Sequence, residues 1–278
     1  PICNAKLQDD SMSVRNLIKQ SNVTLLCTTD DPIDDLKWHK VIKEDETFDV
    51  QVLPAWRPDK ATNVEKPDFV EYLGKLSQVS GVEIKTFADL KEAIAKRMEY
   101  FDSMGCSISD HGLDYVMYAP ASDEEVERIF ADRLAGKEIT KEDAAKYKTA
   151  FMLFLAGKYE EMNWVMQLHY GCKRDNNKAM YAKLGPDTGF DCISNFAPGE
   201  QLADFLNAVN EAKNLPKTIL YCLNPGDDEL IGTILGCFQN SDAIGKIQQG
   251  SAWWFNDNKT GMMKQMTSLA NLGRSEER

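Results

Sequence analysis

The chain has 278 residues, of which 43% are hydrophobic, 27% charged and 9% aromatic, a composition typical of a globular protein with a sizeable core. This composition excludes disorder, collagen and coiled coil. The 44 acidic and 32 basic residues give a formal charge of -12, which disfavours nucleic acid and anionic membranes as partners because the long-range field repels phosphate. An anionic substrate therefore requires a local basic group.

Location and redox state follow from what the sequence lacks. No apolar run approaches the roughly 18 to 20 residues that cross a bilayer, and the first residues lack a signal-peptide layout, so we expect a cytoplasmic protein. The seven cysteines contain no C-x-x-C pair, which favours reduced core thiols over a disulfide or zinc framework. With three histidines, a metal site made from this chain alone would need carboxylates.

Six short apolar segments rich in β-branched residues recur along the chain, each followed by a polar cluster. Short buried runs bounded by turn residues are typical of strands in a parallel sheet. The expected strands are 23–28, 50–56, 106–109, 164–168, 218–223 and 246–250.

Amphipathic stretches between these strands predict helices, and several carry capping signals. Asp31 followed by Pro32 predicts a helix start, and Ser122 with Glu125 predicts a capping box. The expected helices lie at about 31–41, 69–79, 86–101, 122–134, 140–155, 199–213, 227–238 and 258–272.

Alternation of strand and helix predicts an α/β protein with a parallel sheet, either an open doubly wound sheet or a closed barrel. No strand leads into a glycine-rich phosphate-binding turn, whereas nearly every strand ends in a polar cluster. This layout favours a (β/α)₈ TIM-type barrel, with a Rossmann-like open sheet as the alternative. We expect one domain, residues 1–278, with a helical insertion at about 121–161.

Arg57 is the first candidate site residue. It follows the strand 50–56 and precedes Pro58, which stiffens the backbone. A guanidinium there can bind a carboxylate through two parallel hydrogen bonds and supplies the cation that an acidic protein needs for an anionic substrate. The alternative is a structural ion pair with Asp59 or Asp30.

Two further clusters carry acid–base groups. Asp110 and His111 follow one strand directly before Gly112, although Asp110 could equally cap a turn. His169 ends another strand and is available for metal binding or proton transfer, with a satisfied core histidine as the alternative. His39 lies inside a predicted helix and is assigned no role.

Two other features follow strands. Trp253 and Trp254 could line the apolar face of a sugar ring, or could simply be core residues. The segment 184–191 has the spacing of a rigid loop, which could be a lid or a subunit contact.

Taken in order, seven motifs closely resemble the uronate isomerase (glucuronate isomerase) family of the amidohydrolase superfamily. Any one of them is weak, but seven in register are specific, and they span nearly the whole chain. They are Thr28-Thr29-Asp30-Asp31-Pro32, Trp56-Arg57-Pro58-Asp59-Lys60, Ser109-Asp110-His111-Gly112, Gln167-Leu168-His169, 184–191, 215–225 and Trp253-Trp254-Phe255-Asn256-Asp257.

The resemblance implies a metal-dependent, amidohydrolase-like barrel that interconverts D-glucuronate with D-fructuronate and D-galacturonate with D-tagaturonate in carbohydrate metabolism. It implies Arg57, Asp110 and His169 as catalytic residues and Arg57, His111 and Trp253 as substrate-binding residues. The implied cofactor is a divalent metal, zinc or manganese, and the implied partners are a uronate sugar and further copies of the chain.

The chain departs from the family pattern at both ends. Family members begin with a strand bearing a His-x-His metal pair and end with a strand bearing an Asp and an Arg, and the sequence contains neither. We therefore expect an incomplete barrel with six of eight strands and metal ligands largely outside this chain, with His169 as the one candidate ligand. Two readings stay open: a working isomerase, or a catalytically inactive truncated fragment of that enzyme.

Overall fold

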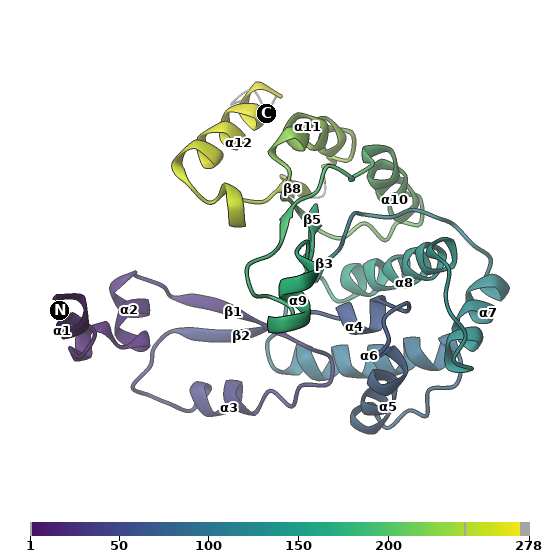
Figure 1. Cartoon of the computed structure of the whole chain (residues 1–278), viewed down its shortest axis with the longest axis horizontal. Helices are drawn as coiled ribbons and strands as arrows, with labels where there is room; N and C mark the ends of the chain where they lie inside the picture. The colour runs from purple at the N-terminus through teal and green to yellow at the C-terminus, as the bar shows by residue number, and fades with distance from the viewer. Residues whose placement is uncertain (1, 242, 273–278) are drawn as a thin grey trace.

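A computed structural model of the chain describes residues 2–241 and 243–272. Its parallel strands form one two-stranded sheet, β1-β2, and one four-stranded sheet of order β3-β4-β7-β8 (Figure 1). The parallel strands are β1 (Leu25–Asp30), β2 (Gln51–Trp56), β3 (His111–Gly112), β4 (Met166–Tyr170), β7 (Thr218–Cys222) and β8 (Ile247–Gln249). The predicted α/β class is confirmed.

Residues 107–113 lie between β2 and β4 and connect the two parallel sheets. Trp56 donates its backbone N–H to Ile108, and Ser109 donates to Val165. The strand expected at 106–109 forms only isolated parallel bridges, at Ile108 and Ser109, followed by the two-residue strand β3. This segment places Asp110 between two neighbouring strands.

Helices connect and cover the strands. They are α1 (Ile2–Lys6), α2 (Val14–Gln20), α3 (Lys37–Lys43), α4 (Asp59–Thr62), α5 (Phe69–Ser80), α6 (Phe87–Ser103), α7 (Asp123–Leu134), α8 (Lys141–Glu161), α9 (Lys178–Leu184), α10 (Gly199–Glu211), α11 (Asp228–Cys237) and α12 (Lys259–Asn271). In the part of the chain that the structure describes, no helix has the length and apolar character needed to span a membrane.

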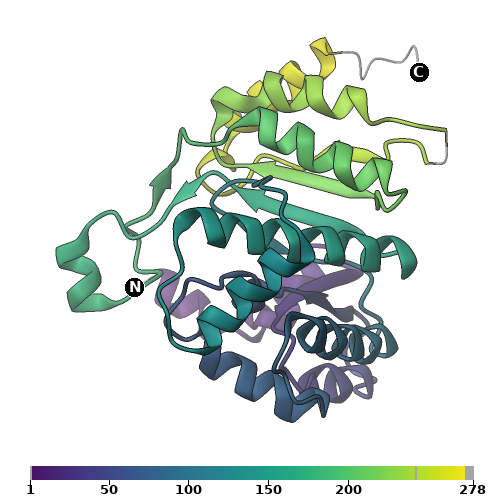
Figure 2. The same ribbon diagram turned by 90° about the vertical axis from the view of Figure 1, so that its right-hand side faces the viewer.

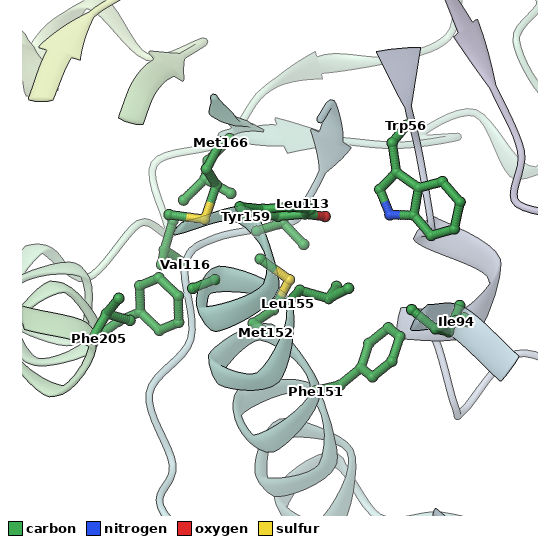
Figure 3. Close-up of a cluster of buried hydrophobic side chains, with 14 of the residues drawn as sticks. Trp56, Ile94, Leu113, Val116, Phe151, Met152, Leu155, Tyr159, Met166 and Phe205 are labelled. Atoms are coloured by element: carbon green, nitrogen blue, oxygen red, sulfur yellow. The ribbon is translucent and has the colours of Figure 1, made fainter. Parts of the chain in front are cut away.

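The hydrophobic core lies between α8 and the strands (Figure 3). Phe151, Leu155 and Tyr159 of α8 are fully buried, as is Trp56 at the end of β2. The Trp56 ring meets Phe101 of α6 edge-on, with ring centroids 4.9 Å apart, an arrangement that aromatic rings favour. The core therefore fixes the carboxyl end of β2, directly before Arg57.

Successive side chains of β4 and β7 alternate between the core and the opposite face of the sheet. In β4, Met166, Leu168 and Tyr170 are buried in the core, whereas Gln167 and His169 on the opposite face are partly exposed. The same alternation runs through β7. Because successive side chains in a strand point to opposite faces, helix packing on one face leaves the other free for polar groups.

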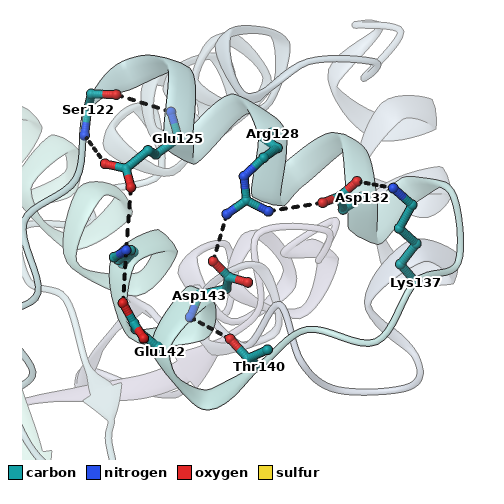
Figure 4. Close-up of polar contacts among 9 residues, drawn as sticks. Ser122, Glu125, Arg128, Asp132, Lys137, Thr140, Glu142 and Asp143 are labelled. Carbon is teal, nitrogen blue, oxygen red and sulfur yellow. Dashed lines mark hydrogen bonds and ion pairs between the residues drawn. The ribbon is translucent and has the colours of Figure 1, made fainter.

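Side chains cap the N-termini of both α7 and α8 (Figure 4). Ser122 accepts the backbone N–H of Glu125 and the Glu125 carboxylate accepts that of Ser122, which completes the predicted capping box. Thr140 caps α8 by accepting the N–H of Asp143, and Arg128 of α7 binds the Asp143 carboxylate. These local contacts define the two helices between β3 and β4.

The helix predicted at 31–41 begins later than expected, at Lys37. The Asp31 carboxylate accepts the N–H of Ile33 and so closes a turn instead of capping a helix. Leu36 then adopts a left-handed backbone with φ of 51°, and the helix starts after it. A competing side-chain turn therefore overrides the Asp-Pro start signal.

An excursion spanning 172–193 was not anticipated as structure (Figure 2). It consists of α9 between the antiparallel strands β5 (Cys172–Lys173) and β6 (Cys192–Ile193). Arg174 at its base binds the Asp191 carboxylate at 2.8 Å. The loop predicted at 184–191 is the return of this excursion.

All seven cysteines are free, as predicted. The prediction that they are core residues is wrong for four of them, which are exposed to solvent. Cys106, Cys172 and Cys222 are buried, whereas Cys3, Cys27, Cys192 and Cys237 are exposed.

Candidate active site

Arg57 and Asp110 meet at the carboxyl end of β2. Arg57 follows the last residue of the strand, and its backbone N–H binds the carbonyl of Asp30 at the end of β1. Its Nη2 atom lies 2.5 Å from Oδ2 of Asp110, whose own N–H binds the Trp56 carbonyl. The ends of parallel strands thus bring the two charges together.

Asp110 also contacts His169, with 2.7 Å between Oδ1 and the imidazole Nδ1. Burial alone would raise the pKa of the Asp110 carboxyl. The hydrogen bond from His169 and the positive charge of Arg57 outweigh burial, and the pKa is lowered. Asp110 is therefore ionised at neutral pH, with Arg57 bound to Oδ2 and the His169 ring in contact with Oδ1.

The partner of Nδ1 determines the tautomer of the His169 ring. An ionised carboxylate only accepts hydrogen bonds, so the neutral imidazole carries its proton on Nδ1 and leaves Nε2 as an acceptor. The ring is stacked on Tyr221, with centroids 4.2 Å apart, and meets the Trp253 ring edge-on at 4.9 Å. His169 is held on three sides.

A cavity of about 210 Å³ opens beside these residues. Its lining combines charged groups with the Trp253 ring and includes Arg57 and His169. The lining residues are Arg57, Asp59, Asn63, Glu65, Lys66, Gly112, Leu113, Asp114, His169, Tyr170, Cys172, Arg174 and Trp253. Such a mixture suits a small polar ligand.

Asp59 is a site residue that the sequence suggested only as an ion-pair partner of Arg57. Its carboxylate accepts the N–H of Gly112 and lies 3.8 Å from Nε of Arg57. Burial raises the pKa of Asp59 to about 7, against the lowering effects of Arg57 and the Gly112 N–H. A carboxyl that titrates near neutrality therefore lines the cavity.

Arg174 and Tyr221 were also missed. Arg174 lines the cavity from the base of the excursion and stacks over Trp254, with 5.1 Å between its guanidinium carbon and the ring centroid. Tyr221 occupies the β7 position in register with His169. Only the alternation within the expected strand 218–223 signalled Tyr221, since it shares a face with Ile219.

His111 is not brought to the cavity. Its side chain is fully buried, and its Nε2 atom lies 2.9 Å from the hydroxyl of Tyr159. Burial lowers the pKa of His111 to about 3, so the ring is neutral. The structure thus groups Arg57, Asp110, His169 and Trp253 and leaves His111 beneath them in the core.

The donor set does not make a complete metal site by itself. Across 2–241 and 243–272, no group of three or more His, Cys, Asp or Glu side chains is placed to hold a metal ion. His169 points Nδ1 at Asp110, and a stable divalent site usually has at least three protein ligands. The described residues therefore do not complete a metal site around His169.

Comparison with known proteins gives one consistent result. Residues 2–275 match the family model described as glucuronate isomerase. The uronate isomerase of Lachnospira eligens is 63% identical over 271 residues, which is 98% of this chain and 58% of that protein. The uronate isomerase of Pectobacterium atrosepticum is 47% identical, with the same two coverages. The chain thus spans little more than half the length of these relatives.

Two solved structures resemble the whole architecture. The uronate isomerase of Thermotoga maritima superposes with a TM-score of 0.85 at 33% identity, covering 93% of this chain and 55% of that one. The glucuronate isomerase of Caulobacter crescentus gives a TM-score of 0.86 at 25% identity, covering 97% and 55%. Fold and sequence similarity therefore both extend over nearly all of this chain and over little more than half of each relative.

Proposed function

The chain belongs to the glucuronate isomerase family, and on this basis we propose that the protein catalyses aldose–ketose isomerisation of uronate sugars. The proposed reactions convert D-glucuronate to D-fructuronate and D-galacturonate to D-tagaturonate. One observation carries the proposal. Arg57, Asp110 and His169, each expected from the sequence, form one connected cluster at the cavity.

The reaction moves two protons and loses no atoms. One proton leaves C2 and is returned to C1, and another moves from the C2 hydroxyl to the C1 oxygen, through an enediol. A base near C2 and a group that stabilises negative charge on the oxygens are the requirements. A divalent metal, as the family implies, would polarise the carbonyl, but the described side chains do not complete a site for it.

Arg57 is the proposed anion-binding group. Its Nη2 atom binds Asp110, and no hydrogen bond of Nη1 occurs within the described residues. The Arg57 side chain is 40% exposed and lines the cavity. It can therefore bind the substrate carboxylate or the enediolate while staying anchored to Asp110.

His169 is the proposed proton-transfer group, and Asp110 orients it. The free Nε2 of a neutral imidazole can take a proton from C2 or the C2 hydroxyl, and Asp110 stabilises the imidazolium that forms. Trp253 packs edge-on against His169 and provides an apolar wall for a sugar face. Since His111 is buried away from the cavity, we assign substrate contact to Arg57 and Trp253.

We also propose that the chain is a single domain, residues 1–278, folded as an incomplete (β/α)₈ barrel with α7 and α8 as its helical insertion. Parallel pairing from β1 through 107–113 to β8, with Arg57 and His169 at one end of the strands, supports this arrangement. The seven free thiols support a reducing, cytoplasmic location. Self-association is proposed from the family resemblance.

An assay on the 278-residue chain tests the function. D-Glucuronate is incubated with the chain in D₂O with zinc or manganese supplied, and ketose formation and deuterium at C1 are measured by NMR. Turnover that is lost in His169→Asn supports the proposal. A folded chain without turnover would favour the inactive alternative, to which the comparisons lend no support.

A further inference from the structure

The rings of His169 and Tyr221 are stacked almost in parallel. Their centroids are 4.2 Å apart and their planes differ by 7°. The two residues are paired in register across the parallel strands β4 and β7, and both lie on the partly exposed face of their strands. Backbone pairing therefore places the Tyr221 ring against His169, independently of any ligand.

The Tyr221 hydroxyl is connected to the segment that carries Asp110. It donates to Oε1 of Gln167 at 3.0 Å, and Nε2 of Gln167 donates to the carbonyl of Ser109 at 3.2 Å. Ser109 is fully buried and directly precedes Asp110. A path of hydrogen bonds thus connects the ring stacked on His169 to Ser109, the residue directly before Asp110.

Gly250 leaves the space that the Tyr221 ring occupies. Its backbone N–H binds the carbonyl of Leu220, which holds it beside β7. A Cβ atom placed on Gly250 would overlap the Tyr221 ring at Cε1, Cδ1 and Cζ. Any larger residue there would have to displace the ring from His169.

We propose that Tyr221 is a positioning residue for the isomerisation, which holds the His169 imidazole with Nδ1 on Asp110 and Nε2 toward the cavity, and that Gly250 is required to admit its ring. The second dihedral angle of a histidine has a broad, two-fold preference, so nothing intrinsic to the side chain selects this orientation. The parallel stacked ring of Tyr221 holds the plane of the imidazole, and within that plane the Asp110 carboxylate selects Nδ1 as the nitrogen that faces it. The catalytic part of this inference rests on the proposed function of His169.

The first test reads the tautomer of His169 and needs no activity. The chain has three histidines, so selective ¹⁵N labelling of imidazoles gives three resolvable sets of signals. At about pH 9, where imidazoles are ordinarily neutral, we expect His169 protonated on Nδ1 in the natural chain and in Tyr221→Phe. Tyr221→Leu should show a mixture of tautomers, while His39 and His111 keep their signals.

The second test separates positioning from general loss of structure. Tyr221→Leu should lower kcat roughly 10- to 100-fold, as misplacement of a reacting group does, with KM changed less than about 2-fold. Tyr221→Phe should rescue most of kcat. Tyr181→Leu, which alters an exposed tyrosine of α9, is the matched control and should leave both constants unchanged.

Gly250→Ala displaces the ring without removing any site residue. It should lower kcat and mix the tautomers as Tyr221→Leu does. The kcat of the double variant, Gly250→Ala with Tyr221→Leu, should be little lower than that of either single variant, because the two substitutions disturb the same contact. Additive losses would contradict the role assigned to Gly250.

An unchanged His169 tautomer in both Tyr221→Leu and Gly250→Ala would overturn the inference. If Tyr221→Leu fails to fold, the Gly250→Ala spectrum decides. If the natural chain has no turnover, the proposed function fails while the tautomer measurement still tests the positioning of His169.

Discussion

The carboxylate of Asp110 lies 2.7 Å from Nδ1 of His169, and this contact joins two segments that are distant in the sequence. Asp110 reaches it from the segment between β2 and β4, and His169 from β4 itself. The contact determines which imidazole nitrogen faces the cavity, so several expectations about activity depend on it.

Asp110→Asn should lower kcat roughly 100-fold or more, the usual scale for disabling an acid–base pair. The amide can donate to Nδ1 of His169 and so permits the tautomer with the proton on Nε2. Steady-state kinetics measure the loss. Asp204→Asn, on the exposed face of α10, is the control and should match the natural chain. Full activity in Asp110→Asn would contradict the proposed role.

Arg57→Lys should raise KM for D-glucuronate by roughly tenfold, equivalent to about 1.4 kcal/mol, because an ammonium cannot form two parallel hydrogen bonds to a carboxylate. Initial rates over a range of uronate concentrations give KM. Arg15→Lys alters an exposed ion pair with Asp45 and should change nothing. An unchanged KM in Arg57→Lys would show that the substrate carboxylate binds elsewhere.

Asp59 should make stability depend on pH. Its pKa is raised from 3.8 to about 7 in the folded chain, so the folded state binds the proton more tightly than the unfolded state. This stabilisation is present below about pH 4 and is lost as the pH rises through 7. Its size is at most about 4 kcal/mol, at about 1.36 kcal/mol per pKa unit.

Asp59→Asn should therefore be more stable than the natural chain at pH 8, with the difference shrinking toward pH 4. An amide oxygen can still accept the Gly112 N–H, so the fold is retained. Urea unfolding at pH 5 and pH 8 measures the effect. If the free energies of unfolding of the two chains differ by the same amount at both pH values, the Asp59 carboxyl does not titrate between them.

Ser122→Ala should lower the free energy of unfolding by about 1 kcal/mol, because the N-terminus of α7 loses its side-chain acceptor. Ser122→Thr keeps a hydroxyl at this position and serves as the control. Urea unfolding at pH 7 compares the three chains. A loss of the same size in Ser122→Thr would place the effect outside the capping hydrogen bond.

The 278-residue chain should not bind a divalent ion tightly. Within the described residues no three ligand side chains converge, and His169 alone holds a metal weakly. Calorimetric titration with zinc checks this expectation. A one-to-one site tighter than about micromolar, roughly 8 kcal/mol, would contradict it, and repeating the titration on His169→Asn would show whether His169 is a ligand.

Local signals in the sequence determined the elements. The Ser122–Glu125 capping box and the apolar run 164–168 are patterns within a few residues, so the order of residue types is enough to predict a helix start and a strand there. The placement of Arg57 directly after a buried strand also follows, whereas His169, expected after the strand 164–168, lies within β4. The failure at 31–41 shows the limit, because two local signals competed at Asp31.

Only the tertiary structure decided which polar groups meet. The register of β4 against β7 sets Tyr221 beside His169, and core packing turns His111 toward Tyr159 and away from the cavity, although His111 and Asp110 are adjacent in the chain. Register and side-chain direction depend on hydrogen bonds and packing between segments far apart in sequence. The pattern of residues along the chain contains the periodicity that makes each strand and helix. It does not contain the contacts between distant segments that set register and side-chain direction.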